Sequence, residues 1–211
     1  MPNTLGSLSL DAYLEQLASA APAPGGGAVV ALLGAQACAL LAMTLRLTGA
    51  AAKGLQSGQH ALLLKHVDDK RAVFLQLAAA DAQAFTAVMA AYKLPKADDA
   101  ANQLRSEAVQ AAFKQATQVP LLVMAEMAAL LDTAEAVTAI AKASVASDTG
   151  IALQLLAAGL QASRYNLWIN LTYLTDPVFK AEVKRTARRH LAGVKERRRA
   201  LHQRLKALIR A

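Results

Sequence analysis

The chain contains very little cysteine and histidine. Its single cysteine, Cys38, cannot form a disulfide within the chain. Because Cys38 lies in an apolar run, we interpret it as a small buried side chain rather than a reactive thiol. The four histidines are scattered, no Cys/His pair has the spacing of a zinc site, and no HExxH pattern occurs. These absences exclude a disulfide-stabilised fold, and we expect no metal site.

Aromatic residues make up only 4% of the chain, and the β-branched runs that indicate strands are scarce. Alanine and leucine dominate instead, and both have high helix propensity. With 211 residues and 55% hydrophobic content, the chain is long enough to bury a sizeable core. We therefore expect a single all-α domain over residues 1–211, a bundle of roughly seven to nine helices.

Charged residues are missing between Gln16 and Leu45, so a transmembrane helix is one interpretation of this segment. Pro22, Pro24 and three glycines interrupt the segment, and the remainder is rich in small residues. A close-packed helix in the core of a bundle explains it better, and we expect no membrane partner. The N-terminus lacks the basic flank of a signal peptide, so we expect a cytoplasmic protein.

Local signals place the expected helix boundaries. Ser9 is a suitable N-cap for the first helix, and Asp176 followed by Pro177 marks the start of the last one. Pro95 ends a long helical pattern, and we expect Pro120 to divide the next segment into two helices. The expected helices cover about residues 9–19, 28–47, 60–91 and 100–118, and a further helix starts near residue 120. After a break at "ASVASDTG", where Ser147 or Asp148 is a candidate cap, another helix runs to about residue 174, and the last runs from 177 nearly to the end.

Three consecutive glycines, Gly25, Gly26 and Gly27, follow Pro24 and precede a long apolar helix. Glycine-rich turns at helix starts can bind anions through exposed N–H groups. Because no strand precedes this turn and no GK[ST] follows it, the Walker and dinucleotide-binding loops are excluded. Two interpretations remain, a loop that approaches a ligand and a tight turn where two helices cross.

Asp81 stands in an almost wholly apolar stretch, with Leu77, Ala78 and Phe85 as helical neighbours. A carboxylate on an apolar helix face is costly unless it is paired or used, and burial there would raise its pKa. Asp81 is therefore a candidate for general acid/base chemistry. The alternative is a partly exposed aspartate on the solvent face of the helix.

Two further pairs of polar residues are candidates for ligand binding. Lys93 and Lys96 flank a Leu-Pro pair at a helix end and could face an anion, although surface lysines are usually only solvated. Asn166 and Asn170 are four residues apart and share a helix face. They form either a polar patch in an apolar surface or hydrogen bonds between helices.

These features follow one another in an order that resembles the cyclodeaminase/cyclohydrolase family. That family comprises stand-alone methenyltetrahydrofolate cyclohydrolases and the C-terminal domain of formiminotransferase-cyclodeaminase. The matching stretches are "LDAYLEQLASAAPAPGGGAVVALLGA", "DAQAFTAVMAAYKLPK", "QATQVPLLV", "SDTGIALQLLAAGLQASRYNLWINL" and "DPVFKAEV". They cover about residues 8–185, and the chain length is similar to that of a stand-alone member.

The resemblance implies an all-helical, homodimeric, folate-binding enzyme that needs no metal or redox cofactor. It implies that Asp81 is the catalytic carboxylate. We expect the glycine turn to let ligand or a partner helix approach closely, so that Gly26→Ala should impair turnover more than folding. The substrate-binding residues that the resemblance implies are Pro24, Gly25, Gly26, Gly27, Lys93, Lys96, Asp148, Asn166 and Asn170.

We expect hydrolysis of 5,10-methenyltetrahydrofolate to 10-formyltetrahydrofolate, because no formiminotransferase domain is fused to this sequence. One alternative is the formiminotetrahydrofolate cyclodeaminase reaction, which releases ammonia. Another is a folate-binding or helical interaction protein without catalysis. Two departures from the family pattern favour the last alternative: "AKASVASD" lacks a Gly-Asn pair, and "LTGAAAKGLQ" lacks an aromatic residue.

Positive charge is concentrated at the C-terminal end of the chain. The net charge is +8, and from Lys180 onward there are 12 Lys/Arg against 2 Asp/Glu. We expect a basic amphipathic helix from about residue 177 with a solvated outer face. Attraction of the polyglutamate tail of a folate is the second interpretation. Contact with nucleic acid or an anionic membrane is the third, and no nucleic-acid motif supports it.

Overall fold

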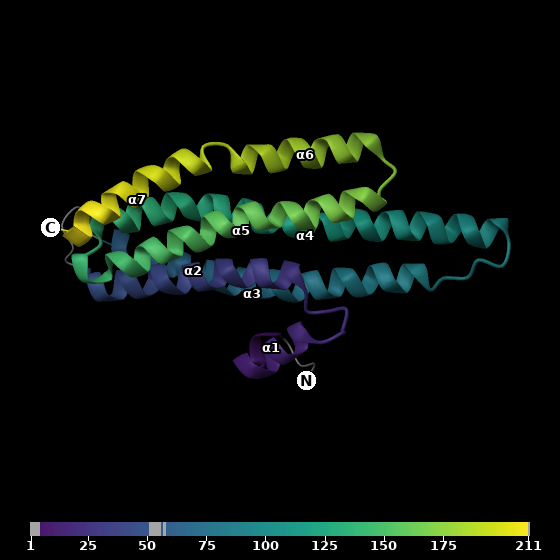
Figure 1. Ribbon diagram of the computed structural model, residues 1–211, viewed down its shortest axis with the longest axis horizontal. Coiled ribbons are helices and arrows are strands. Elements are labelled where there is room, and N and C mark those ends of the chain that lie inside the picture. Colours follow the sequence, from purple (N-terminus) through teal and green to yellow (C-terminus); the bar gives the residue numbers. More distant parts are fainter. Residues whose placement is uncertain (1–4, 51–55, 57, 211) are drawn as a thin grey trace.

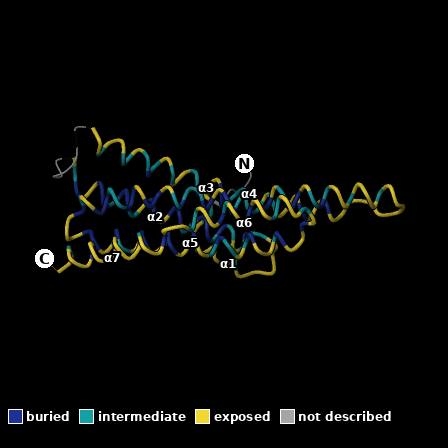
Figure 2. Tube along the Cα trace, turned by 90° about the horizontal axis from the view of Figure 1, so that it is seen from above, coloured by how far each residue is buried: buried dark blue, intermediate teal, exposed yellow. Residues whose placement is uncertain are grey.

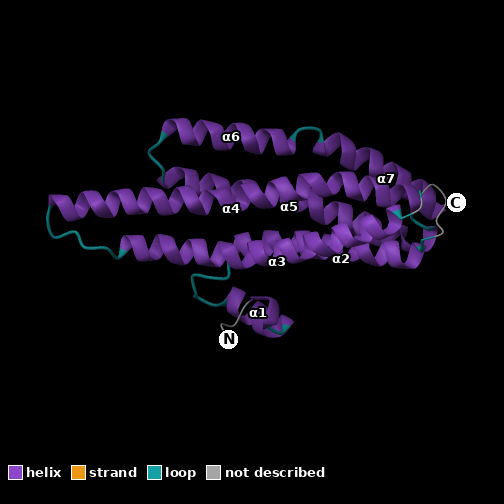
Figure 3. Cartoon of the chain, turned by 180° about the vertical axis from the view of Figure 1, so that it is seen from behind, coloured by secondary structure: helices purple, strands orange, loops and turns teal. Residues whose placement is uncertain are grey.

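The computed structural model describes residues 5–50, 56 and 58–210, and every regular element in that part of the chain is a helix (Figure 1, Figure 3). The expected all-α class is confirmed. Two short 3-10 turns, Leu5–Ser7 and Ala143–Val145, accompany the longer helices. The α-helices are α1 (Leu10–Ala18), α2 (Gly26–Thr48), α3 (Gln59–Tyr92), α4 (Asp99–Ile140), α5 (Ala146–Tyr173), α6 (Pro177–Leu191) and α7 (Val194–Arg210).

Four long helices form the body of an elongated bundle. α2 packs mainly against α3 and α5, and α4 packs against the same two helices. α6 and α7 lie along the side formed by α4 and α5, while the short α1 stands off from the bundle beyond a connecting loop (Figure 1). α1 is the one described α-helix without a buried residue.

α2 lies inside the bundle, and buried positions recur along its whole length (Figure 2). Small residues allow its neighbours to approach closely, since a Cβ atom at Gly34 would lie 2.5 Å from Cε1 of Phe74. Cys38 has no exposed surface, and burial raises the pKa of its thiol to about 12. The interpretations of this segment as a close-packed core helix and of Cys38 as a buried side chain are confirmed.

Within the part of the chain that the structure describes, three segments are long and apolar enough to cross a membrane, judged by length and composition alone. They are Gly26–Thr48, Gln59–Tyr92 and Ala143–Tyr173. The bundle buries 61% of the most apolar window of the first segment but only 17% of that window in the second. Burial in the bundle therefore accounts for the apolar character of α2, whereas much of the apolar surface of α3 is exposed.

The expected division at Pro120 is wrong, because α4 continues through this proline from Asp99 to Ile140. Pro120 is buried, and it has no N–H to donate to the carbonyl of Ala116 one turn earlier. The side-chain amide of Asn170 on α5 donates to that carbonyl instead, at 3.2 Å. A partner helix thus satisfies the acceptor that the proline leaves open, and the helix does not break.

The expected last helix is also wrong in one respect, because it is divided into α6 and α7 at Gly193. Gly193 has a φ of +70°, in the left-handed region that ends many helices. The predicted start of α6 is confirmed, since Asp176 accepts bonds from the N–H groups of Val178 and Phe179, each at 3.0 Å. Ser9 likewise caps α1 by accepting from the N–H of Ala12 at 3.2 Å.

Candidate active site

A cleft of about 660 Å³ opens where the start of α2 meets α3, α4 and the second half of α5. Its wall is mainly apolar, and among the described residues that line it Asp81 carries the only charge expected at neutral pH. Of the residues predicted for the site, this cleft brings together Gly25, Gly26, Gly27, Asp81, Asn166 and Asn170. The cleft thus combines one carboxylate with two amides in an apolar surround, as ligand pockets commonly do.

Asp81 reaches the cleft from the middle of α3 and lies against the first turn of α2. Burial raises the pKa of its carboxyl group, and a hydrogen bond from the backbone N–H of Ala28 opposes that rise. The exposed N–H groups and the dipole at a helix start favour a negative charge. The anion that the glycine turn holds is therefore the protein's own carboxylate.

Gly27 is the glycine that this arrangement requires. A Cβ atom there would lie 2.0 Å from Oδ1 and 2.2 Å from Cγ of Asp81, far inside van der Waals contact. A Cβ atom at Gly26 would meet only Oδ1 of Asn166, at an ordinary 3.7 Å, and one at Gly25 would meet nothing within 4 Å. The expectation that Gly26 is the sensitive position has no steric basis, and the close approach belongs to Gly27.

Asn166 and Asn170 line the cleft from one face of α5, which fits the polar-patch interpretation. Asn170 also makes a bond between helices, because its Nδ2 donates to the Ala116 carbonyl of α4. Asn170 therefore fits both interpretations, since it lines the polar patch and also makes a hydrogen bond between helices. Within the described part of the chain, the side chain of Asn166 has no hydrogen-bond partner, so both of its polar atoms are free for a ligand.

Three aromatic residues, Tyr92, Phe113 and Tyr173, form an aromatic wall of the cleft, and sequence reasoning missed it. Phe113 stacks on Tyr173 with ring centroids 4.7 Å apart and an interplanar angle of 12°. Tyr92 meets Phe113 edge-on, with centroids 6.1 Å apart. The three rings come from α3, α4 and α5, so no periodic signal within one helix could have revealed them. Such a wall suits a flat, conjugated ligand.

Four predicted site residues lie outside the lining of this cleft. Pro24 is buried beside the turn, while Lys93 and Lys96 are exposed at and beyond the end of α3. Asp148 lies in the first turn of α5, 18 residues before Asn166, which is about 27 Å along a helix. Asp148 and Asn166 therefore cannot meet the same small ligand within a single chain.

The remaining expectations are the absence of a metal site and the two departures from the family pattern, in "AKASVASD" and "LTGAAAKGLQ". Within the described residues, no three His, Cys, Asp or Glu side chains gather as metal ligands, and the absence of a metal stays a prediction. The stretch "AKASVASD" forms the turn that leads into α5. The other departure falls largely on residues 51–55, which lie outside the described residues.

Known proteins with a similar sequence point to folate chemistry. The chain is 35% identical to a methenyltetrahydrofolate cyclohydrolase of Methylorubrum extorquens over 178 residues, which cover 84% of this chain and 86% of that protein. It is 30% identical to the formimidoyltransferase-cyclodeaminase of Rattus norvegicus over 83% of its own length. This second match spans only 33% of the longer rat protein.

The fold and the family pattern agree with these relatives. The crystal structure of a formiminotetrahydrofolate cyclodeaminase from Thermotoga maritima matches with a TM-score of 0.85 and 28% identity, covering 97% of this chain and 99% of that one. The family pattern described as formiminotransferase-cyclodeaminase matches residues 9–189. The prediction of an enzyme of the cyclohydrolase or cyclodeaminase kind is confirmed. The chain belongs to the formiminotransferase-cyclodeaminase family.

Proposed function

We propose that the chain hydrolyses 5,10-methenyltetrahydrofolate to 10-formyltetrahydrofolate, with Asp81 as the general acid and base. The observation that carries the proposal is the single carboxylate of the cleft, half-buried beside the start of α2 in a lining that is otherwise mainly apolar and includes the aromatic wall. The substrate is a flat conjugated cation, which matches both features. The similarity to the Methylorubrum extorquens cyclohydrolase, which extends over most of both chains, supports this choice of reaction.

The chemistry requires one group that handles a proton twice. Water adds to the amidinium carbon that bridges N5 and N10, and it loses a proton as the C–O bond forms. The C–N5 bond then breaks, and N5 takes up a proton as it leaves. A carboxylate that accepts the first proton can return it at N5, while the remaining hydroxyl proton passes to solvent as the formyl C=O forms. The cationic bridge thus becomes a neutral formyl group with the release of one proton overall, and such general acid/base help contributes typically about 10²–10⁴-fold in rate. In its ionised form Asp81 also stabilises the cationic bridge.

The assay for this proposal follows the loss of ultraviolet absorbance of 5,10-methenyltetrahydrofolate. A blank without protein corrects for spontaneous hydrolysis. We expect acceleration that saturates with substrate and that is unchanged after treatment with a chelator, because we propose no metal or other cofactor. A rate equal to the blank at all substrate concentrations would contradict the proposed reaction.

Cyclodeamination of formiminotetrahydrofolate is the second candidate, and the similarity of the whole fold to the Thermotoga maritima cyclodeaminase favours it. In that reaction N10 attacks the formimino carbon and ammonia leaves, so the same carbon needs the same proton transfer. Ammonia release from formiminotetrahydrofolate distinguishes this reaction from the hydrolysis. Binding of a folate with neither reaction would favour the third candidate, a binding protein without catalysis.

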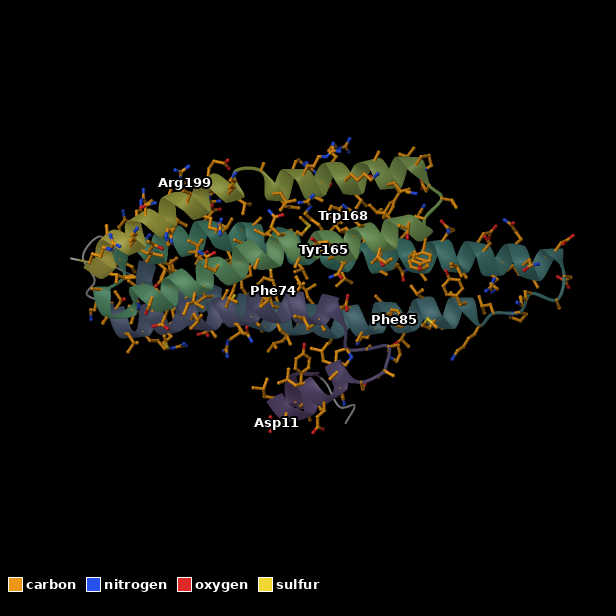
Figure 4. The ribbon with its side chains drawn as sticks, viewed as in Figure 1. Asp11, Phe74, Phe85, Tyr165, Trp168 and Arg199 are labelled. Carbon is orange, nitrogen blue, oxygen red and sulfur yellow. The ribbon has the colours of Figure 1, made fainter. Side chains whose placement is uncertain are left out.

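We also propose that the chain acts as a homodimer and that α1 belongs to the interface. Leu10 and Leu14 on α1 are 69% and 49% exposed, and Figure 4 shows Asp11 on this helix well apart from the body of the bundle. A second copy that covers α1 would bury these leucines. Light scattering should give twice the mass of the chain. A variant with Leu10→Ser and Leu14→Ser should form a weaker dimer, which dissociates at a higher protein concentration than the wild type does. A single-chain mass at micromolar concentration would contradict the dimer.

A further inference from the structure

Pro120 leaves one backbone acceptor of α4 without its helical partner at the wall of the cleft. In a regular α-helix the N–H of residue 120 would donate to the carbonyl of Ala116, and proline has no N–H. Ala116 lines the cleft, while Pro120 is buried behind it, next to a small void that Asp81 also lines. The open carbonyl therefore lies at the site itself rather than on the surface of the bundle.

The amide of Asn170 fills this position from the neighbouring helix. Its Nδ2 donates to the Ala116 carbonyl at 3.2 Å, and this is the one hydrogen bond that the side chain makes within the described residues. An asparagine amide can be turned either way, and only the nitrogen can donate to a carbonyl. The bond thus fixes the orientation of the amide and leaves Oδ1 of Asn170 as an open acceptor.

We propose that Pro120 is a positioning residue for ligand recognition, because it reserves the Ala116 carbonyl for Asn170 and so fixes the Asn170 Oδ1 atom as an acceptor for an N–H donor of the ligand. The edge of a pterin ring carries such N–H groups, so this assignment extends the proposed function and rests on it for the identity of the ligand. The positioning of Asn170 by Pro120 is a property of the protein without ligand, and it is tested on the protein without ligand.

The variant Pro120→Ala restores an N–H to α4 that competes with Asn170 for the Ala116 carbonyl. Four asparagines occur in the chain, so labelling the side-chain amides with ¹⁵N-asparagine gives four pairs of N–H signals, and the variant Asn170→Ala identifies the pair that is the signal of Asn170. In Pro120→Ala we expect this signal to shift and to exchange faster with water. An unchanged signal would overturn the proposal, whatever reaction the protein catalyses.

The second readout is substrate affinity. We expect Pro120→Ala to raise KM for 5,10-methenyltetrahydrofolate about tenfold and to change kcat by less than about twofold, the scale of one neutral hydrogen bond. The melting temperature should stay the same or rise, because the substitution repairs a helix. Leu122→Ala, on the exposed side of the same turn, is the matched control and should behave as the wild type.

A double-mutant cycle separates positioning from general damage. If Pro120 acts through Asn170, Pro120→Ala has no further effect on KM in an Asn170→Ala background. An equal rise of KM in both backgrounds would overturn the proposal, since the proline would then act by another route. Should the wild type bind no folate, the proposed function fails while the amide signal still decides the role of Pro120.

Discussion

At the scale of single residues, the site depends on the fit of one carboxylate beside one glycine. Asp81 lies where a side chain on residue 27 would have to be. We expect Gly27→Ala to displace the carboxylate from the N–H of Ala28 and to lower kcat/KM at least about 100-fold, the lower range for the loss of a general acid/base. Gly26→Ala is the matched control, because its Cβ atom has ordinary contacts only. Equal loss in both variants would contradict the role given to Gly27.

Asp81 should also make the folded state depend on pH. Burial raises the pKa of its carboxyl group in the folded protein, so ionisation is unfavourable there relative to the unfolded chain. The stability that the protonated form provides is complete below the ordinary pKa of 3.8 and is lost as the pH rises through the raised value. Asp81→Asn should therefore raise the melting temperature at pH 7, and the difference from the wild type should shrink toward pH 3.5.

Scanning calorimetry of the wild type and Asp81→Asn across this range checks the prediction. Glu182→Gln, at an exposed position on α6, is the control and should show no such trend. A gain in stability that is independent of pH would show that ionisation of Asp81 is not its cause.

The residues that could be predicted from the sequence are those whose surroundings are local. Asp81 stands out because its helical neighbours are apolar, and Asn166 and Asn170 because they share one helix face. Gly27 could not be separated from Gly25 and Gly26, since the difference arises from a side chain on another helix. The aromatic wall was missed for the same reason, because three helices contribute one ring each.

At the scale of the helices, a proline and a glycine that can each interrupt a helix differ in what they do here. Pro120 does not interrupt α4, because Asn170 supplies the missing hydrogen bond from α5. Gly193 was not predicted as a break, yet it separates α6 from α7. Proline and glycine mark a boundary only when no neighbouring helix compensates, and that depends on tertiary structure that a single sequence does not reveal.

Gly193 gives a stability prediction for this boundary. Its φ of +70° is strained for a residue with a side chain, so Gly193→Ala should lower the free energy of unfolding by about 1 kcal/mol. Gly150→Ala is the control within a helix, where a Cβ atom would meet Leu205 at an ordinary 3.7 Å. That variant should gain up to about 1 kcal/mol. Urea unfolding measures the free energy of unfolding of both variants. A Gly193→Ala variant with the same free energy of unfolding as the wild type would contradict the predicted backbone strain.

At the scale of the whole molecule, positive charge and the cleft belong to different parts of the bundle. The cleft is lined by α2 to α5 and by the loop before α2, with no lining residue from the described α6 or α7. Figure 4 shows Arg199 on the outer side of α7, and Arg197 pairs with Asp132 at 2.6 Å. This separation favours a solvated outer face over capture of a substrate tail.

The basic face can be tested by charge reversal. We expect a variant with Arg185→Glu and Arg199→Glu to keep kcat/KM within about twofold for folates with one glutamate and with several, since exposed charges at a distance are screened. Turnover at two salt concentrations measures this directly. A loss confined to the polyglutamylated substrate would instead assign these cations to its tail, and binding of random DNA at low salt would favour nucleic acid.

The sequence order of the family pattern did not reveal distances across the molecule. Asp148 and Asn166 belong to one matching stretch, yet the length of α5 separates them. The all-α class followed from composition, because alanine and leucine outnumber strand-forming residues throughout. The meeting of α2, α3 and α5 at Asp81 follows from packing between distant segments, which composition does not determine.

The measurement that tests the central claim most directly compares the wild type with Asp81→Asn on 5,10-methenyltetrahydrofolate, each at saturating substrate and corrected for spontaneous hydrolysis. Asparagine keeps the shape of the side chain but cannot accept and return the proton. We predict that kcat falls by about 10²–10⁴-fold while the variant remains folded and still binds the substrate. A variant that hydrolyses the substrate as fast as the wild type would contradict the account.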